Sequence, residues 1–220
     1  RGFTEVAKEV GAEIVGEVKH PLGTADYSIF LPRIQALKPD ILIFNNFGRD
    51  NHVSIKQASE FGLKKNMKFA TPVLLYTARQ AAGAKVYEGV LGATSYYWSI
   101  QDNVASAKAF NDHYKALNNG AYPSDYGALA YSAVKSLLIA VKTAGTTDTE
   151  KVVDALAALK YDTYKGPQYY SACDHQSVQS VFIIESKDAP ASQPDDVFTV
   201  VKEVPASEKI LRTCAALALT

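Results

Sequence analysis

The 220-residue chain has no excess of charge of either sign, because 23 Lys and Arg residues balance 23 Asp and Glu residues. Partners such as nucleic acid or an anionic membrane select basic surfaces, so the balance argues against both. No apolar run approaches the about 20 residues that a membrane-spanning helix needs. With 47% hydrophobic and 21% charged residues, the composition is that of an ordinary globular protein.

Motifs of nucleotide- and metal-dependent enzymes are also missing: there is no Walker A sequence, no G-x-G-x-x-G and no H-E-x-x-H. The four histidines are scattered without an i, i+4 pair: His20, His52, His113 and His175. Asp174-His175 suggests a catalytic dyad, but no nucleophile elbow accompanies it. We therefore expect no metal, no cofactor and no enzymatic activity.

Cysteine is scarce, and its two copies, Cys173 and Cys214, lie far apart without a C-x-x-C or zinc spacing. Two interpretations stay open. Either both cysteines are buried thiols of a cytosolic protein, or they form one disulfide that ties the C-terminal tail to the Cys173 segment. The even count and the polar residues 174–176 favour the disulfide, which implies an oxidising compartment.

The first ten residues read as a helix with Phe3, Val6, Ala7 and Val10 on one face and Gly11 as its C-cap. A doubly wound domain should begin with a strand instead. We therefore expect its first strand, or a whole lobe, to lie upstream of residue 1.

Residues 1–98 then alternate between strand and helix, which favours a parallel α/β lobe. Strands are expected at residues 12–18, 40–44, 67–75 (with its exit loop) and 89–95, and helices at 30–37, 51–61 and 77–86. The apolar run over 40–44 predicts a strand buried on both faces. Because ligands bind beyond the carboxyl ends of parallel strands, the loop Asn45–Asp50 is the first candidate for a binding site.

Three helices follow without an intervening strand, at residues 103–117, at 125–142 and after a capping box at 147–150. Their periodicity predicts these inward residues: Ala107, Phe110, Tyr114, Leu117, Leu129, Val134, Leu137, Leu138, Val141, Val152, Leu156 and Leu159. They need a sheet to pack on, and none is predicted locally. Strands are expected again at 165–170, 177–186 and 197–201.

Tyr96-Tyr97-Trp98 stands where the α/β pattern gives way to the helical one. Aromatic residues on strands usually belong to the core, but pockets prefer domain interfaces, so both interpretations stay open. Strand alternation would direct Tyr97 to one side and Tyr96 with Trp98 to the other.

Six short stretches together resemble the branched-chain amino-acid-binding family, the type I periplasmic solute receptors of ABC importers: residues 21–28, 34–41, 56–58 with 60–63, 87–89 and 174–176. The resemblance implies an α/β fold of two Rossmann-like lobes that close around a small ligand, present here without the N-terminal portion. Residues 1–98 and 178–220 would form the second lobe, and residues 99–177 the returning helical part of the first. It also implies a periplasmic location, a membrane permease as partner and the Cys173–Cys214 disulfide.

The resemblance further implies ligand contacts after the second and third predicted strands and before the long helix: Asn46, Phe47, Pro72, Val73, Leu74 and Tyr122. In such a receptor we expect one or more of Tyr96, Tyr97 and Trp98, together with Phe47, to form the walls of the cleft. Family members offer an acid to the ligand ammonium from the 72–74 loop, which has none here, so a free amino acid would require a substitute such as Asp50. The aromatic residues suggest an apolar or aromatic carboxylate. The alternatives are a ligand-sensing domain of this fold and a flavodoxin-like or Rossmann enzyme.

Overall fold

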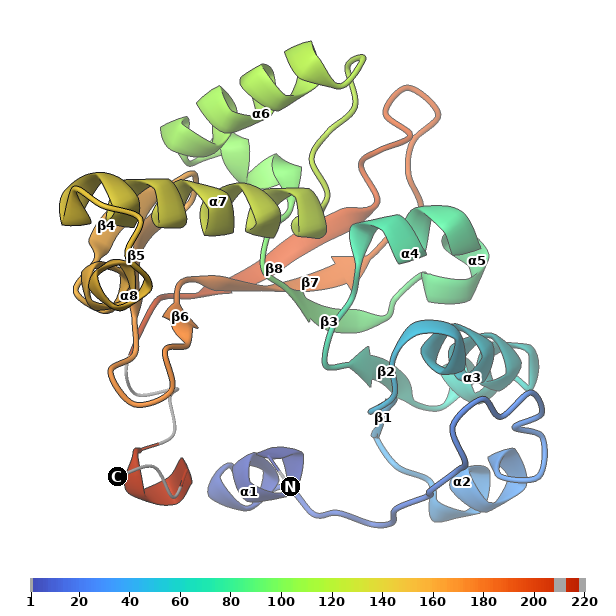
Figure 1. Ribbon diagram of the computed structural model, residues 1–220. Coiled ribbons are helices and arrows are strands. Elements are labelled where there is room, and N and C mark those ends of the chain that lie inside the picture. Colours follow the sequence, from blue (N-terminus) through green and yellow to red (C-terminus); the bar gives the residue numbers. More distant parts are fainter. Residues whose placement is uncertain (1, 208–212, 218–220) are drawn as a thin grey trace.

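The structure, a computed structural model, describes residues 2–207 and 213–217 and consists of two parts (Figure 1). One part contains a five-stranded sheet with helices in its connections. The other contains three helices in succession and a three-stranded sheet. The predicted α/β class is confirmed.

The five-stranded sheet has the order β1-β2-β3-β7-β8. Its first three strands are parallel: β1 (Ile41–Ile43), β2 (Lys68–Thr71) and β3 (Leu91–Thr94). The other two join them in antiparallel pairing: β7 (Val181–Ser186) and β8 (Phe198–Val204). α2 (Leu31–Leu37) precedes β1, and the connections between β1, β2 and β3 hold α3 (Gly48–Glu60), η1 (Leu63–Lys65), α4 (Tyr76–Ala82) and α5 (Ala84–Tyr87).

The second part begins with η2 (Trp98–Asp102) and contains α6 (Ala105–Leu117), α7 (Asp125–Ala144) and α8 (Thr149–Ala157). A small antiparallel sheet follows, formed by β4 (Lys160–Thr163), β5 (Gly166–Tyr170) and β6 (Ser177–Val178). The expectation that no local sheet exists is therefore wrong. The polar composition of β4, Lys-Tyr-Asp-Thr, hid this strand from the hydrophobic pattern.

Among the described residues, the chain crosses between the two parts at residues 95–97, after β3, and at residues 179–180, before β7. The second crossing divides the single strand predicted over 177–186 into β6 and β7. Because β3 and β7 pair with Thr94 opposite Phe182, the two crossings lie side by side.

Helix ends follow the sequence signals with small shifts. Gly145 ends α7 in the left-handed conformation at φ 66°, as predicted. The N-cap of α8 is Asp148 rather than Thr147, and its Oδ1 atom accepts from the Lys151 N–H at 3.2 Å. The helix predicted over 77–86 is divided at Gly83, where φ is 78°.

The strand predicted over residues 12–18 is wrong. α1 (Gly2–Glu9) leads into an extended segment without ladder hydrogen bonds, in which Ile14 and Val15 are 50% and 44% exposed. The two-sided burial predicted for β1 is also wrong, since Ile41 is 51% exposed. β1 is an edge strand that pairs only with β2 in the described sheet, so part of its surface has no cover.

α7 buries its small residues, and three of the five large residues predicted to face inward are exposed. The buried residues include Ala128, Ser132, Ser136 and Ala140. The predicted inward residues Val134, Leu137 and Leu138 are exposed, as is Leu117 of α6. The outward face of α7 carries an apolar groove of about 610 Å³ lined by Ala130, Tyr131, Val134, Lys135, Leu138, Ile139 and Lys142.

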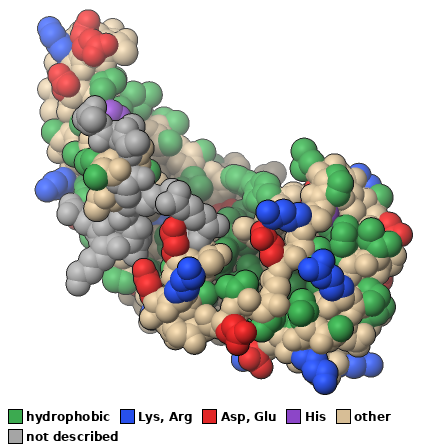
Figure 2. Space-filling model, turned by 90° about the horizontal axis from the view of Figure 1, so that it is seen from below, with side chains coloured by type: hydrophobic (Ala, Val, Ile, Leu, Met, Phe, Trp, Pro, Cys, Tyr) green, Lys and Arg blue, Asp and Glu red, His purple; other side chains and the backbone are tan. Residues whose placement is uncertain are grey.

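The face seen from below also carries hydrophobic side chains at the surface (Figure 2). α1 lies on this side of the molecule (Figure 1), and its Phe3 and Val6 are 43% and 55% exposed. Within the described ranges, no helix is long and apolar enough to cross a membrane.

Candidate ligand-binding site

Three loops leave the carboxyl ends of β1, β2 and β3, and they share one edge of the sheet because these strands are parallel. Ligands of open α/β sheets bind at this edge. All the predicted contacts except Tyr122 lie on these loops or directly after them. Tyr122 lies on the segment that leads into α7.

Asn46 is the centre of a hydrogen-bond network that joins the first loop to the second. Its Nδ2 group donates to Ser54 Oγ at 3.1 Å, and its Oδ1 atom accepts from Asn51 Nδ2 at 3.2 Å. Asn51 Nδ2 also donates to Thr71 Oγ1, 3.0 Å away at the end of β2. The network orients the Asn46 amide, while the neighbouring Phe47 side chain is 60% exposed.

The second loop turns one residue inward and another outward. Leu74 is 1% exposed and lies directly over Gly92 of β3, where an added Cβ would be 2.4 Å from the Leu74 Cβ. Val73, which precedes it, is 43% exposed, and Pro72 is half-buried. Of the three predicted contacts in this loop, Val73 and Pro72 therefore offer side-chain surface to a ligand, and Leu74 does not.

The third loop contributes to an aromatic cluster formed by Tyr76, Tyr97, Trp98 and Tyr122. The rings of Trp98 and Tyr122 stack with centroids 4.2 Å apart, Tyr97 lies 5.4 Å from Trp98, and Tyr76 lies 5.9 Å from Tyr97. The cluster brings together side chains from α4, the loop after β3 and the segment before α7.

Tyr96 does not belong to this cluster. Its hydroxyl donates to Asn111 Oδ1 at 2.7 Å, and its ring contacts Phe110 and Tyr164 in the second part. The predicted alternation is wrong, because Trp98 lies with Tyr97 and not with Tyr96. The extended backbone ends at Tyr97 and Trp98 begins the 3-10 turn η2, so the two-residue period stops there.

Asp195, in the loop between β7 and β8, holds this aromatic cluster together. Its backbone carbonyl accepts from Tyr97 Oη at 2.9 Å and from Trp98 Nε1 at 3.0 Å. Its Oδ1 atom accepts from Tyr76 Oη at 2.8 Å. Burial first, and then the Asp195 carboxylate, raise the pKa of Tyr76, so its hydroxyl stays protonated and donates. Nothing in the sequence of this Pro- and Asp-rich loop signalled the role.

Asp125 is a second residue that the sequence reasoning did not single out. It begins α7, is 3% exposed, and its Oδ1 atom has no hydrogen-bond partner within the described part of the chain. Burial raises the pKa of this carboxyl, and the backbone N–H groups of Asp125, Tyr76 and Tyr126 oppose that effect. Because Tyr76 begins α4, Asp125 marks the point where the first turns of α4 and α7 meet.

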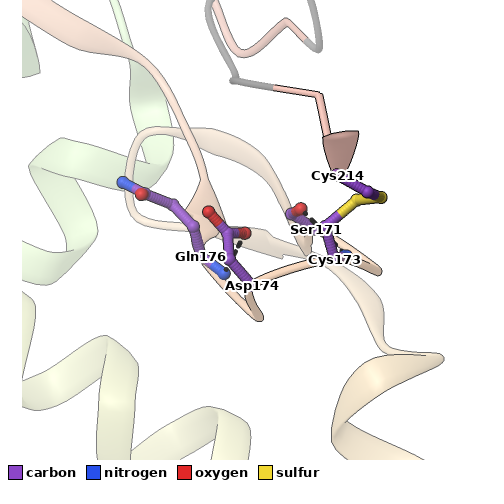
Figure 3. The surroundings of a disulfide bond; sticks show 5 residues. All are labelled: Ser171, Cys173, Asp174, Gln176 and Cys214. Atoms are coloured by element: carbon purple, nitrogen blue, oxygen red, sulfur yellow. Dashed lines mark hydrogen bonds between the residues drawn. A yellow bond between two sulfur atoms is a disulfide. The ribbon is translucent and has the colours of Figure 1, made fainter. Parts of the chain in front are cut away.

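The other acids that the sequence suggested have different roles. Asp50 is 5% exposed and accepts from the Gly23 N–H at 3.0 Å, so its carboxylate faces the turn that precedes α2. Asp174 accepts from the Gln176 N–H at 3.1 Å, and this bond lowers the pKa of its carboxyl (Figure 3). Asp174 therefore shapes a surface turn. Separately, no cluster of His, Cys, Asp or Glu among the described residues is arranged to hold a metal.

The disulfide is confirmed: Cys173 and Cys214 are bonded, with Cα atoms 5.3 Å apart (Figure 3). It fastens the segment before η4 (Ala215–Leu217) to the turn between β5 and β6. In the loop-entropy model a loop of this length contributes roughly 4 kcal/mol of stability.

Comparison with known families agrees with this architecture, since residues 1–191 match the family model described as periplasmic binding protein. The chain belongs to this family. The match assigns the family more directly than the fold class does, because many unrelated functions share one fold class.

Relatives of this periplasmic binding protein confirm its resemblance to the branched-chain amino-acid-binding group. Leu/Ile/Val-binding protein homolog 4 of Brucella abortus is 28% identical over 176 residues, which are 78% of this chain and 41% of that protein. An amino acid ABC transporter substrate-binding protein from Pseudomonas fluorescens Pf-5 superposes with a TM-score of 0.87 at 25% identity, over 100% of this chain and 57% of that one.

A leucine-, isoleucine-, valine-, threonine- and alanine-binding protein from Brucella ovis, in its closed conformation, is also similar. Its TM-score is 0.82 at 25% identity, over 95% of this chain and 54% of that one. This periplasmic binding protein thus spans less than half of the curated relative and little more than half of the solved structures. The roles of its candidate residues as ligand contacts stay predictions.

Proposed function

We propose that this periplasmic binding protein captures a small molecule outside the cytoplasm and delivers it to the membrane permease of an ABC importer. The match of residues 1–191 to the family carries the proposal. The disulfide supports an oxidising, periplasmic setting, because such bonds are rare in the cytosol. The proposal assigns no catalytic step to the chain.

In this proposal the two parts are lobes that close over the ligand. Residues 1–98 and 178–220 belong to one lobe, and residues 99–177 belong to the other. The side-by-side crossings at residues 95–97 and 179–180 support this division, since a pair of adjacent linkers permits rotation of one lobe against the other. The Cys173–Cys214 disulfide is a further covalent connection between the two lobes in this division.

The exposed candidates would contact the ligand directly, and the buried ones would form the wall behind them. Phe47, Val73 and Pro72 offer side-chain surface, and Asn46 is held beside them by its network. Leu74, Tyr96 and Tyr97 are each 1% exposed, so they would act by holding the wall in place. The stacked pair Trp98 and Tyr122 would lie where the two lobes approach each other.

The ligand class is an amino acid or an apolar or aromatic carboxylate. The Brucella relatives are named for binding leucine, isoleucine and valine. The loop that follows β2 has no acid, and Asp50 is bonded to Gly23. An unpaired buried ammonium would be costly, which favours a carboxylate without an ammonium group unless Asp125, with its unpaired oxygen, accepts one.

Native mass spectrometry of the full-length protein tests this function, because a ligand enclosed between the two lobes would remain bound through purification. Calorimetry and thermal melts with leucine, valine, phenylalanine, benzoate and phenylacetate would follow. A ligand at 100 times its Kd should add about 2.7 kcal/mol of stability. Retention of no small molecule, together with no thermal shift across this panel, would contradict the proposal.

We also propose that further chain of the same protein covers the exposed apolar faces of α7 and α1. The α7 groove supports this, because its lining is apolar apart from two lysines, Lys135 and Lys142. The limited coverage of the relatives agrees with it. The covering segment would be the N-terminal portion that the sequence analysis predicts.

A further inference from the structure

A buried lysine lies between the two segments through which the chain crosses from one part to the other. Lys165, in the turn between β4 and β5, is 5% exposed. Its Nζ group donates to the carbonyl oxygen of Ser95 and, at 2.8 Å, to that of Ser180. One side chain of the helical part therefore bonds to both crossings.

Both acceptors lie just outside the regular sheet. The pairing of β3 with β7 ends at Thr94 opposite Phe182; Ser95 directly follows Thr94, and Ser180 directly precedes β7, whose first residue is Val181. Their carbonyl groups would otherwise need water or a ladder partner. The Lys165 amine supplies both bonds, and it does so from a separate element.

The surroundings of the Lys165 amine disfavour its charged form, so a lysine at this position costs stability if its role is purely structural. Nζ lies 5.8 Å from the centre of the Phe182 ring, and burial lowers the pKa of Lys165 to about 7. Glu203 of β8, opposite Phe182 in the ladder, is the charged group that raises it again. Charge-assisted bonds to two carbonyls are among the stronger hydrogen bonds and offset part of that cost.

We propose that Lys165 is a clasp that sets the resting angle between the two parts of the molecule. Rotation at a hinge is absorbed by a few backbone torsions, here those near Ser95 and Ser180, and these torsions also move the carbonyl oxygens. A side chain bonded to both oxygens favours one setting of the pair. The role of this angle rests on the proposed function, because in a receptor the angle determines how readily the lobes close over a ligand. The contacts of Lys165 do not depend on it.

The test measures the angle without any ligand, in the full-length protein. Spin labels are attached at Lys56→Cys in α3 and Ala109→Cys in α6, both exposed, and their separation is measured by pulsed electron resonance. Lys165→Met removes the donors and keeps the length of the side chain. Lys160→Met, an exposed lysine on the same hairpin, is the matched control.

We expect Lys165→Met to shift the mean separation by several ångströms and to broaden its distribution, while Lys160→Met leaves the distribution unchanged. Lys165→Arg, which keeps several donors, should restore much of the wild-type distribution. If Lys165→Met does not fold, the same distance measurement is made on Lys165→Gln, because the shorter glutamine amide cannot bond to both carbonyl oxygens. A folded Met or Gln variant with the wild-type distribution overturns the clasp.

The same labels separate this inference from the proposed function. A shift in Lys165→Met, with no solute of the panel moving the wild-type distribution, keeps the clasp and counts against the receptor. Closure of the wild type by a solute, with unchanged distributions in the variants, keeps the receptor and rejects the clasp.

Discussion

Phe47 and Tyr97 lie on loops at the same edge of the sheet, but the side chain of Phe47 is exposed and that of Tyr97 is buried. Phe47 is the N-cap residue of α3, without a side-chain cap bond, and is 60% exposed. Tyr97 is 1% exposed, and its hydroxyl accepts from the N–H groups of Val197 and Phe198 at 2.9 and 3.2 Å. A change at Phe47 should therefore report on binding alone, whereas one at Tyr97 also alters the fold.

We expect Phe47→Ala to lower the affinity for the ligand found by mass spectrometry by roughly 30- to 1,000-fold, about 2–4 kcal/mol. Its free energy of unfolding should stay within about 0.5 kcal/mol, because the side chain is mostly exposed. Phe61→Ala, at the other end of α3 and 42% exposed, is the control and should change neither. Affinity within twofold of wild type in Phe47→Ala would remove Phe47 from the cleft wall.

Lys165 should also make stability depend on pH. Its pKa is lowered to about 7 in the fold from 10.5 in the unfolded chain, so the unfolded state binds more protons between these values. Stability from this group therefore rises as pH increases above about 7, with a slope of at most about 1.4 kcal/mol per pH unit, and is flat below.

Urea titrations of the full-length protein at pH 6, 7.5 and 9 measure this slope, compared with Lys165→Met. We expect the variant to lose the alkaline rise and Lys160→Met to keep it. Parallel pH profiles for the wild type and Lys165→Met would show that the buried amine does not titrate in this range.

At the scale of elements, β3 and the loop after β2 approach each other at Gly92. An added Cβ there would lie 2.4 Å from Leu74 Cβ and 3.3 Å from the Leu74 backbone nitrogen. These atoms are not the flexible end of a side chain, so the loop itself would have to move. Gly127 in α7 differs, because its added Cβ would meet the Tyr114 hydroxyl at 3.2 Å, the far end of a long side chain.

We therefore expect Gly92→Ala to lower the free energy of unfolding by about 1–3 kcal/mol through overpacking, and to displace Val73 from the candidate site. Gly127→Ala should be neutral or stabilising by up to about 1 kcal/mol, since Ala favours a helix interior. Urea denaturation of both variants of the full-length protein makes the comparison. Equal stability of the two would mean that Leu74 moves away without cost.

At the scale of the whole molecule, the exposed apolar surfaces determine how the chain behaves by itself. Large side chains of α7 point away from the described core, and the apolar residues of α1 are exposed. Contiguous patches of this kind mark interaction surfaces. Residues 1–220 expressed alone should therefore lack a sharp cooperative melt and bind a dye for exposed apolar surface.

Leu138→Glu tests whether further chain covers α7. In residues 1–220 alone the change should reduce dye binding, because Leu138 is 63% exposed there. In the full-length protein it should destabilise by more than about 2 kcal/mol, since it would bury a charge in an apolar interface. Leu22→Glu, at a side chain 96% exposed in a turn, is the control and should be neutral in both. A neutral Leu138→Glu in the full-length protein would leave the α7 face uncovered.

Local signals in the sequence predicted much of the fold and the position of the candidate site. Glycine stops such as Gly62 and Gly145 lie in left-handed conformation beyond α3 and at the end of α7, because side chains rarely adopt it. The apolar runs predicted the strands β1, β2 and β3, and the order of these strands predicted which loops share one edge of the sheet. The cysteine count and its polar setting favoured the disulfide.

Only the tertiary structure decided which faces are buried and which side chains meet. Periodicity shows that α7 has an apolar stripe, but the small residues Ala128 and Ser132 face the described core because α7 packs closely there. Asp195 joins Tyr76, Tyr97 and Trp98 across about a hundred residues of sequence, and Lys165 joins Ser95 to Ser180. Hydrogen bonds of this kind carry no local signature, because their partners come together only when the chain has folded.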